Sequence, residues 1–146
     1  MRFALFCICL LLPSAVLAGP DRVSVLLGTQ HFGATREFQE VNPGLFLTWE
    51  GQLDYSVGLF YNSYEDISPI ATVAKDWEVA PGLELGVFAG LAIYPGEGDQ
   101  FRLSAGDLVP LIGLQATYGN FFAQFIPADG DSVDSVLAVG LTFELD

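Results

Sequence analysis

The chain has 146 residues, of which 18 are acidic and five are basic, so its formal net charge is −13. This acidity argues against nucleic-acid binding, because phosphate groups are bound mainly by lysine and arginine. The length allows one domain and not two. Although 51% of the residues are hydrophobic, no segment beyond the N-terminal one is apolar over a long enough run to form a transmembrane helix.

The N-terminal segment has the features of a secretory signal peptide. Arg2 precedes a short apolar run, and small residues at its end place the cleavage site after about Ala18. Both cysteines lie inside this segment, so the remaining chain has no thiol for disulfides, thiolate catalysis or metal ligation. We predict a signal peptide over residues 1–18 and a single β-barrel domain over residues 19–146.

A secreted chain that is hydrophobic and poor in helix favours a transmembrane β-barrel, because backbone polar groups inside a bilayer must be paired within the protein. Alternating apolar residues predict eight strands. In chain order these strands span residues 21–32, 45–50, 52–62, 69–79, 83–93, 108–118, 121–127 and 135–145. In the first strand, Val23, Val25 and Leu27 are expected to share one face with His31.

Short turns and long polar loops alternate along the chain. The short turns are predicted at Gly51, at Pro81-Gly82 and at Gly119-Asn120. This asymmetry is usual for outer-membrane barrels. We therefore predict an all-β fold: an eight-stranded antiparallel up-and-down transmembrane β-barrel of the outer-membrane type. The apolar outward faces weigh against the alternative of a secreted soluble lipid carrier, whose exterior would be polar.

The inward faces of the predicted strands combine glycines with aromatic residues, among them Gly86, Gly90 and Phe88. An eight-stranded barrel is just wide enough inside for side chains or for one slim ligand. Two interpretations stay open. The glycines permit the tight curvature of a small barrel, or their missing side chains leave a slot for an acyl chain.

Two prolines stand at the same end of the hairpin formed by the sixth and seventh predicted strands. They are Pro110 and Pro127, in the run LVPLIGLQATYGNFFAQFIP. Proline has no N–H group to donate to a β ladder, so it is rare in the middle of a sheet. The pair is expected to leave a short unpaired seam between adjacent strands, through which a lipid tail could pass.

The histidine of the chain, His31, ends the first predicted strand, and Ser63 ends the third. The strand count places both residues at the rim that carries the long loops. A histidine and a serine at one mouth of a barrel could form a base–nucleophile or base–positioner pair for acyl transfer. The alternative is that His31 is an ordinary polar residue of the rim.

Four sequence runs occur in a characteristic order. They are FQEVNPG at 38–44, GLFYNSYEDISPIA at 58–71, LELGVFAG at 83–90 and the hairpin run at 108–127. With these runs the chain resembles, from about residue 25 to 145, the lipid A palmitoyltransferase family of outer-membrane barrels (PagP) and its shorter relatives. It departs from that family in a shortened loop after His31 and in lacking the amphipathic helix before the barrel.

The resemblance implies an activity that moves a palmitoyl chain from a phospholipid to lipid A in the outer leaflet. It places the catalytic histidine on His31 and the family's Asp-Ser pair on Asn62-Ser63. A neutral amide can only hydrogen-bond, whereas an aspartate could carry a charge and select a histidine tautomer. A catalytically inactive lipid-binding or structural barrel therefore stays as the alternative to an acyltransferase.

The resemblance also assigns residues to lipid access and to the acyl-chain pocket. The lateral access prolines fall on Pro110 and Pro127, and a further family proline matches Pro43. The family glycine that measures the acyl chain falls on Ala74, so a bound or transferred chain is predicted to be shorter than palmitoyl. The predicted acyl-chain pocket comprises Ala74, Phe88, Gly86 and Gly90.

The expected partners are membrane lipids, namely phospholipid and lipopolysaccharide, and no nucleic acid. We expect a monomer in the outer membrane of a Gram-negative cell, delivered by the cleaved signal peptide. The sequence predicts neither a cofactor nor a metal site.

Overall fold

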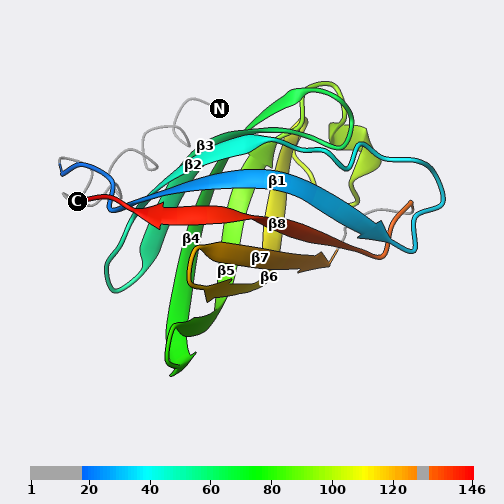
Figure 1. The fold of residues 1–146 in the computed structure, drawn as a ribbon. Helices are drawn as coiled ribbons and strands as arrows, with labels where there is room; N and C mark the ends of the chain where they lie inside the picture. Colours follow the sequence, from blue (N-terminus) through cyan, green and yellow to red (C-terminus); the bar gives the residue numbers. More distant parts are fainter. Residues whose placement is uncertain (1–17, 128–131) are drawn as a thin grey trace.

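In a computed structural model that describes residues 18–127 and 132–146, the chain forms a closed antiparallel barrel (Figure 1). Each strand pairs with its neighbours in sequence, and β8 closes the barrel against β1. The strands are β1 (Arg22–Phe32), β2 (Gly44–Trp49), β3 (Asp54–Tyr61), β4 (Ile67–Ala80), β5 (Leu83–Ile93), β6 (Leu108–Tyr118), β7 (Phe121–Pro127) and β8 (Ser135–Glu144). The predicted all-β, eight-stranded, up-and-down architecture is confirmed. The signal peptide predicted at the N-terminus lies, except for its last residue, outside the described residues.

The two ends of the barrel differ in the length of their connections. Short turns join β2 to β3, β4 to β5 and β6 to β7, and the described termini lie at this same end (Figure 1). Gly82 and Gly119 have φ angles of 73° and 58° in these turns, a conformation that glycine adopts without steric cost. Longer connections stand at the opposite end, and the one between β5 and β6 contains a 3-10 helix at Gly98–Gln100. We call the two ends the short-turn end and the long-loop end.

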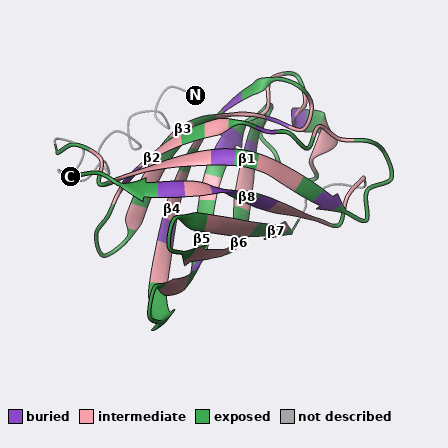
Figure 2. Ribbon diagram, viewed as in Figure 1, coloured by how far each residue is buried: buried purple, intermediate pink, exposed green. Residues whose placement is uncertain are grey.

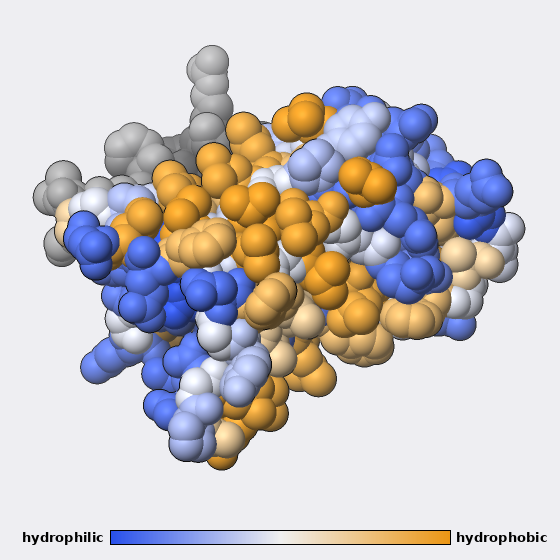
Figure 3. Space-filling model, in the orientation of Figure 1, coloured by the Kyte–Doolittle hydropathy of each residue, from blue (hydrophilic) through white to orange (hydrophobic). Residues whose placement is uncertain are grey.

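The outer face of the barrel is apolar. Figure 3 shows hydrophobic side chains gathered in a broad band across the strands, with hydrophilic side chains toward the two ends. Many of the exposed side chains in this band are large and apolar: Leu45, Tyr55, Val57, Leu59, Leu85, Val87, Leu91, Ile112, Leu114, Phe125 and Val139. The predicted alternation is thus confirmed, because the intervening residues point inward and are less exposed (Figure 2). Within the described ranges, no helix is long and apolar enough to cross a membrane.

One predicted face is wrong, because β1 contains a β-bulge. The pairing with β8 shifts between Leu26 and Gly28, so Leu27 is an extra residue in this ladder. Leu27 is 52% exposed on the outer face, whereas His31 is 8% exposed and lines the interior. A bulge turns the residues that follow it onto the opposite face of the sheet. His31 therefore does not share the outward face of Val23 and Val25.

The inward aromatic rings lie over glycines of neighbouring strands. Three directly paired positions have this arrangement: Phe46 with Gly58, Phe88 with Gly113, and Phe122 with Gly140. A Cβ atom added to any of these glycines would lie within 2.5–2.8 Å of a ring carbon. Such contacts are too short for a methyl group. At these three positions the absence of a side chain on glycine therefore makes room for the aromatic ring of the paired residue. Pairing of glycine with an aromatic ring is a known way of stabilising a curved sheet.

Candidate active site and lipid cavity

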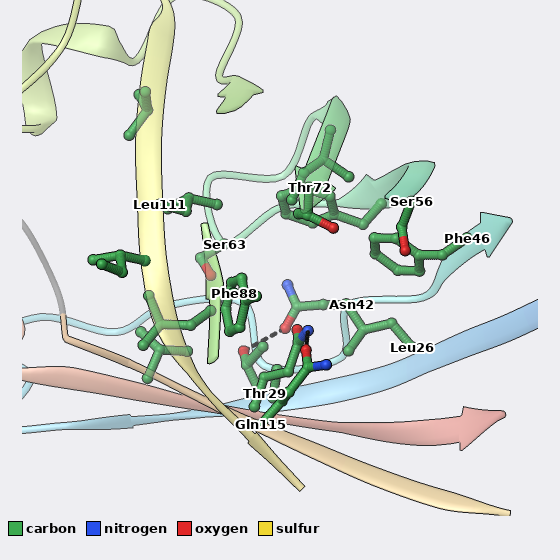
Figure 4. A pocket seen from close by; sticks show the side chains of 18 of the residues that line it. Leu26, Thr29, Asn42, Phe46, Ser56, Ser63, Thr72, Phe88, Leu111 and Gln115 are labelled. Atoms are coloured by element: carbon green, nitrogen blue, oxygen red, sulfur yellow. Dashed lines mark hydrogen bonds between the residues drawn. The ribbon is translucent and has the colours of Figure 1, made fainter. Parts of the chain in front are cut away.

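The interior of the barrel contains a cavity of about 390 Å³. Its middle section is lined by apolar side chains from several strands, including Leu26, Phe88 and Leu111 (Figure 4). His31 and Ser63 line the cavity toward the long-loop end, and polar side chains line it toward the short-turn end. The middle of the cavity is therefore apolar, and both of its ends are polar. We call the long-loop end of the cavity its mouth.

At this mouth the structure brings His31 and Ser63 together. His31 lies near the end of β1, and Ser63 lies two residues beyond β3 in the loop that leads to β4. The Oγ atom of Ser63 lies 2.9 Å from Nε2 of His31. The side chain of His31 is only 4% exposed, so this hydrogen bond is largely shielded from water. Nucleophile and base at this separation have the geometry that proton transfer from a hydroxyl requires.

The β1–β2 loop supplies the remaining surroundings of His31. The ring of Phe38 stacks on the imidazole, with 4.5 Å between centroids and 11° between planes. The Oε1 atom of Glu40 lies 3.7 Å from Nδ1 of His31. Nδ1 is buried and has no hydrogen-bond partner among the described residues. Sequence patterns gave no reason to select Glu40, because it lies in an acidic loop without strand periodicity.

Asn62, which the resemblance aligned with a catalytic aspartate, faces its own loop. Its side chain is fully buried, at 0% exposure. Its Oδ1 atom accepts hydrogen bonds from the backbone N–H groups of Tyr64 (2.8 Å) and Asp66 (3.1 Å), and its Nδ2 group donates to Ser68 Oγ (2.9 Å). This turn also contains Glu65, a non-glycine residue at φ 67°. Asn62 therefore fixes the loop that carries Ser63.

A second buried amide, Asn42, was not selected from the sequence. It is 1% exposed and links β1 to β3: its Oδ1 atom accepts from Thr29 Oγ1 at 2.6 Å, and its Nδ2 group donates to the Tyr61 carbonyl at 2.9 Å (Figure 4). The β1–β2 ladder ends at Leu26 and Gly44. Asn42 thus replaces ladder bonds beside the site, and the adjacent Pro43 is exposed and does not line the cavity. A polar residue immediately before Pro-Gly was the only available signal.

Pro110 and Pro127 lie on adjacent strands, toward the same end, as predicted. The β6–β7 ladder extends from Tyr118 and Phe121 only as far as Leu114 and Phe125. Beyond that point residues 108–113 of β6 remain paired with β5 but have no described partner on β7. Pro110 and Pro127, which belong to the outward faces of their strands, nevertheless line the cavity. The cavity therefore reaches the outside of the barrel through this seam.

The four residues predicted for an acyl-chain pocket fall into two groups. Ala74 and Phe88 are paired across β4 and β5, and both line the cavity. Gly86 and Gly90 do not line it. An added Cβ would lie 1.7 Å from Asp76 Oδ1 at Gly86 and 2.6 Å from Thr72 Cγ2 at Gly90. The space at these two glycines is therefore taken by neighbouring side chains rather than left as a slot.

Polar side chains line the cavity at its short-turn end. Gln115 Nε2 lies 2.8 Å from both carboxylate oxygens of Asp76 and donates to them. Gln124 Nε2 donates to Gln115 Oε1 at 3.2 Å, which extends the network across β4, β6 and β7. An acyl chain could not displace these groups without leaving polar atoms unpaired.

Aromatic side chains surround the mouth at the long-loop end. Tyr64 makes edge contacts with Phe38, Tyr94 and Phe101, and the guanidinium of Arg36 lies 5.0 Å from the Tyr64 ring centroid. Burial raises the pKa of Tyr64, although Arg36 opposes this effect, and burial also raises the pKa of Tyr94. Both phenols are therefore neutral near pH 7. The aromatic cluster is connected to His31 through Phe38, which stacks on the imidazole and contacts Tyr64.

Fold and site together define a class: a small closed antiparallel barrel with an apolar cavity, a lateral seam and a histidine–serine pair at one mouth. Comparison of the chain with protein-family models, and with curated protein sequences, found no match.

Proposed function

We propose that the protein is an outer-membrane acyltransferase that takes an acyl chain from a phospholipid and transfers it to lipid A. The observation that carries this proposal is the Ser63 Oγ–His31 Nε2 contact of 2.9 Å at the mouth of an apolar cavity. The apolar band around the barrel suits an environment of lipid tails. The seam between β6 and β7 gives a tail a lateral route into the cavity.

In the proposed reaction the acyl ester of the phospholipid lies next to Ser63 while its chain occupies the cavity. His31 Nε2 takes the proton from Ser63 Oγ as that oxygen bonds to the ester carbonyl carbon. The ester C–O bond then breaks, and the imidazolium returns the proton to the departing lysophospholipid oxygen. A hydroxyl of lipid A attacks the acyl-serine by the same steps in reverse order, which restores the serine.

Cells expressing the wild-type chain, His31→Ala and Ser63→Ala provide the test. Mass spectrometry of lipid A should show an added acyl chain only for the wild-type protein, because either substitution removes one partner of the proton transfer. Since Ala74 takes the place of glycine on the cavity wall, the added chain should be shorter than palmitoyl. Ser24→Ala is a suitable control, because it also removes one side-chain hydrogen bond, the bond to Thr142. That bond lies on the β1–β8 ladder, away from the mouth. Identical lipid A from all four strains would refute the transferase.

A barrel that binds an acyl chain without chemistry is the second candidate. It is favoured by the neutral amide of Asn62, which occupies the position that the resemblance gives to the family's aspartate and whose hydrogen bonds go to Tyr64, Asp66 and Ser68 rather than to His31. In that case phospholipid or fatty acid should co-purify equally with the wild-type chain and with His31→Ala, and lipid A should be unchanged.

A further inference from the structure

We infer that Glu40 is a positioning residue for His31: its carboxylate holds the imidazole with the proton on Nδ1, which leaves Nε2 free to accept the proton of Ser63. This inference rests on the proposed function, to which it adds a third group. Neither the sequence patterns nor the family resemblance assigned a role to Glu40.

The first observation is the state of His31 Nδ1. It is buried, it has no hydrogen-bond partner among the described residues, and one face of its ring is covered by Phe38, which offers no acceptor. A buried polar atom left unpaired is energetically costly. The carboxylate oxygen Oε1 of Glu40 faces Nδ1 of His31 at a distance of 3.7 Å. Catalytic hydrogen bonds are often long without substrate and shorten when it binds, so a small movement of the carboxylate would satisfy Nδ1.

The second observation is that Glu40 is attached to the same strand as His31. Its backbone carbonyl accepts a hydrogen bond from the N–H group of Thr29 at 2.8 Å. Its carboxylate accepts from the N–H group of His31 at 3.2 Å and from Gln30 Nε2 at 3.1 Å. Gly28 makes this approach sterically feasible, since a Cβ atom there would lie 2.6 Å from the Glu40 carbonyl oxygen. The carboxylate is therefore held beside the imidazole by main-chain and side-chain bonds.

The nearby carboxylate of Glu40 favours one tautomer of His31. A neutral imidazole carries its proton on one nitrogen only, and the hydrogen bond of that nitrogen fixes which one. A carboxylate attracts an N–H group at Nδ1 and repels a lone pair there. The serine hydroxyl requires the opposite arrangement at Nε2, where a lone pair must accept its proton. Glu40, His31 and Ser63 thus have the order of acid, base and nucleophile found in hydrolytic triads.

The tautomer can be measured directly, because the chain contains one histidine. Protein labelled with ¹⁵N in histidine, refolded in detergent without a polyhistidine tag, should show neutral imidazole with the proton on Nδ1. In Glu40→Gln and Glu40→Ala the signal should shift toward the Nε2-protonated form or toward a mixture. Glu40→Asp, which keeps the charge, should shift less. Glu37→Gln is the matched control, because Glu37 lies in the same loop, whereas the carboxylate beside His31 belongs to Glu40. A wild-type imidazole protonated on Nε2, or a tautomer unchanged in Glu40→Gln, would overturn the inference.

The kinetic measurement separates this inference from the proposed function. If the barrel transfers acyl chains, Glu40→Gln should lower the rate about tenfold to a hundredfold, while Glu37→Gln should leave it unchanged, since orientation of a general base supplies part of its contribution. A wild-type transfer rate retained in full by Glu40→Gln would overturn the positioning role even if acyl transfer is established. An absence of transfer by the wild-type chain would refute the proposed function, and the tautomer measurement would still decide the role of Glu40.

Discussion

Asn62 and Ser63 are neighbours in the chain but serve the site in different ways. Ser63 directs its hydroxyl toward His31, whereas Asn62 directs its amide into the β3–β4 loop, where it bonds two backbone N–H groups and Ser68. A side chain that points away from His31 can therefore decide where the hydroxyl of Ser63 lies.

Replacement of Asn62 by alanine should destabilise the barrel and misplace Ser63. The substitution leaves the N–H groups of Tyr64 and Asp66 without their acceptor, which should cost about 2–3 kcal/mol. Urea unfolding of the refolded protein in detergent measures the free energy of unfolding. Asn62→Asp keeps an acceptor oxygen and should lose much less. Equal stabilities for Asn62→Ala and the wild-type protein would contradict this account of the loop.

The residues of the candidate site could be predicted from the sequence where their residue type is rare in the chain. The histidine of the sequence and a serine at the end of a predicted strand suggested His31 and Ser63, and the family resemblance supported this choice. Glu40 was not predictable, because acidic residues are frequent in this chain and because its position depends on a backbone contact with Gly28. Such a contact leaves no periodic signal in the sequence.

The seam between β6 and β7 is a property of paired strands rather than of single residues. Both strands continue past the last ladder pair, Leu114 and Phe125, but residues 108–113 have no described partner on β7. If the register continued, Ile112 would face Pro127, which has no N–H group to donate. The interrupted ladder leaves this part of the wall able to open without loss of hydrogen bonds between the two strands.

A disulfide across the seam should block lipid access. The double substitution Ile112→Cys and Pro127→Cys joins positions that would face each other, and no other thiol would remain once the predicted signal peptide is removed. Oxidation should abolish acyl transfer, or lipid uptake, and reduction should restore it. The control is a pair already in the ladder, Leu114→Cys with Phe125→Cys. Its oxidation should have no effect, and equal behaviour of the two disulfides would rule out the seam as the route.

Strand positions followed closely from alternation and turn residues, whereas the β1 bulge did not. An apolar residue at Leu27 fits a regular ladder as well as a bulged one, because both arrangements place it on the outer face. The shift becomes visible only from the partners of Leu26 and Gly28 on β8. Pairing between the first and last strands is set by closure of the barrel, and a local sequence pattern does not reveal it.

The whole molecule combines an apolar outside with an interior that is polar at both ends. The fold class was predictable because every strand contributes the same alternation, so that errors in single strands do not change the result. The filling of the interior was less predictable. Whether a glycine leaves a slot or receives an aromatic ring depends on its partner across the ladder, as for Gly113 and Phe88.

A cationic side chain within the apolar band should destabilise the barrel in lipid. Val87 lies near the middle of β5 and is 45% exposed. Val87→Arg should cost about 2–4 kcal/mol in phospholipid vesicles, as is typical of an arginine at the bilayer midplane. Val41→Arg is the control, because Val41 is 68% exposed in the β1–β2 loop, outside the band. The free energy of unfolding should be lower for Val87→Arg than for Val41→Arg. Equal values for the two variants, or folding of the wild-type chain in water without detergent, would exclude a membrane setting.

The extra residue in β1 decides which face of the barrel carries His31. Before Leu27, odd-numbered side chains of the strand face outward; after it, the odd-numbered His31 faces inward. If the whole of β1 instead paired with β8 as a regular ladder, with Leu27 in the register, the barrel could still close with the same strands. His31 would then fall on the outer face, and the hydroxyl of Ser63 would have no imidazole beside it. The proposed histidine–serine chemistry therefore depends on an irregularity that closure of the barrel does not require.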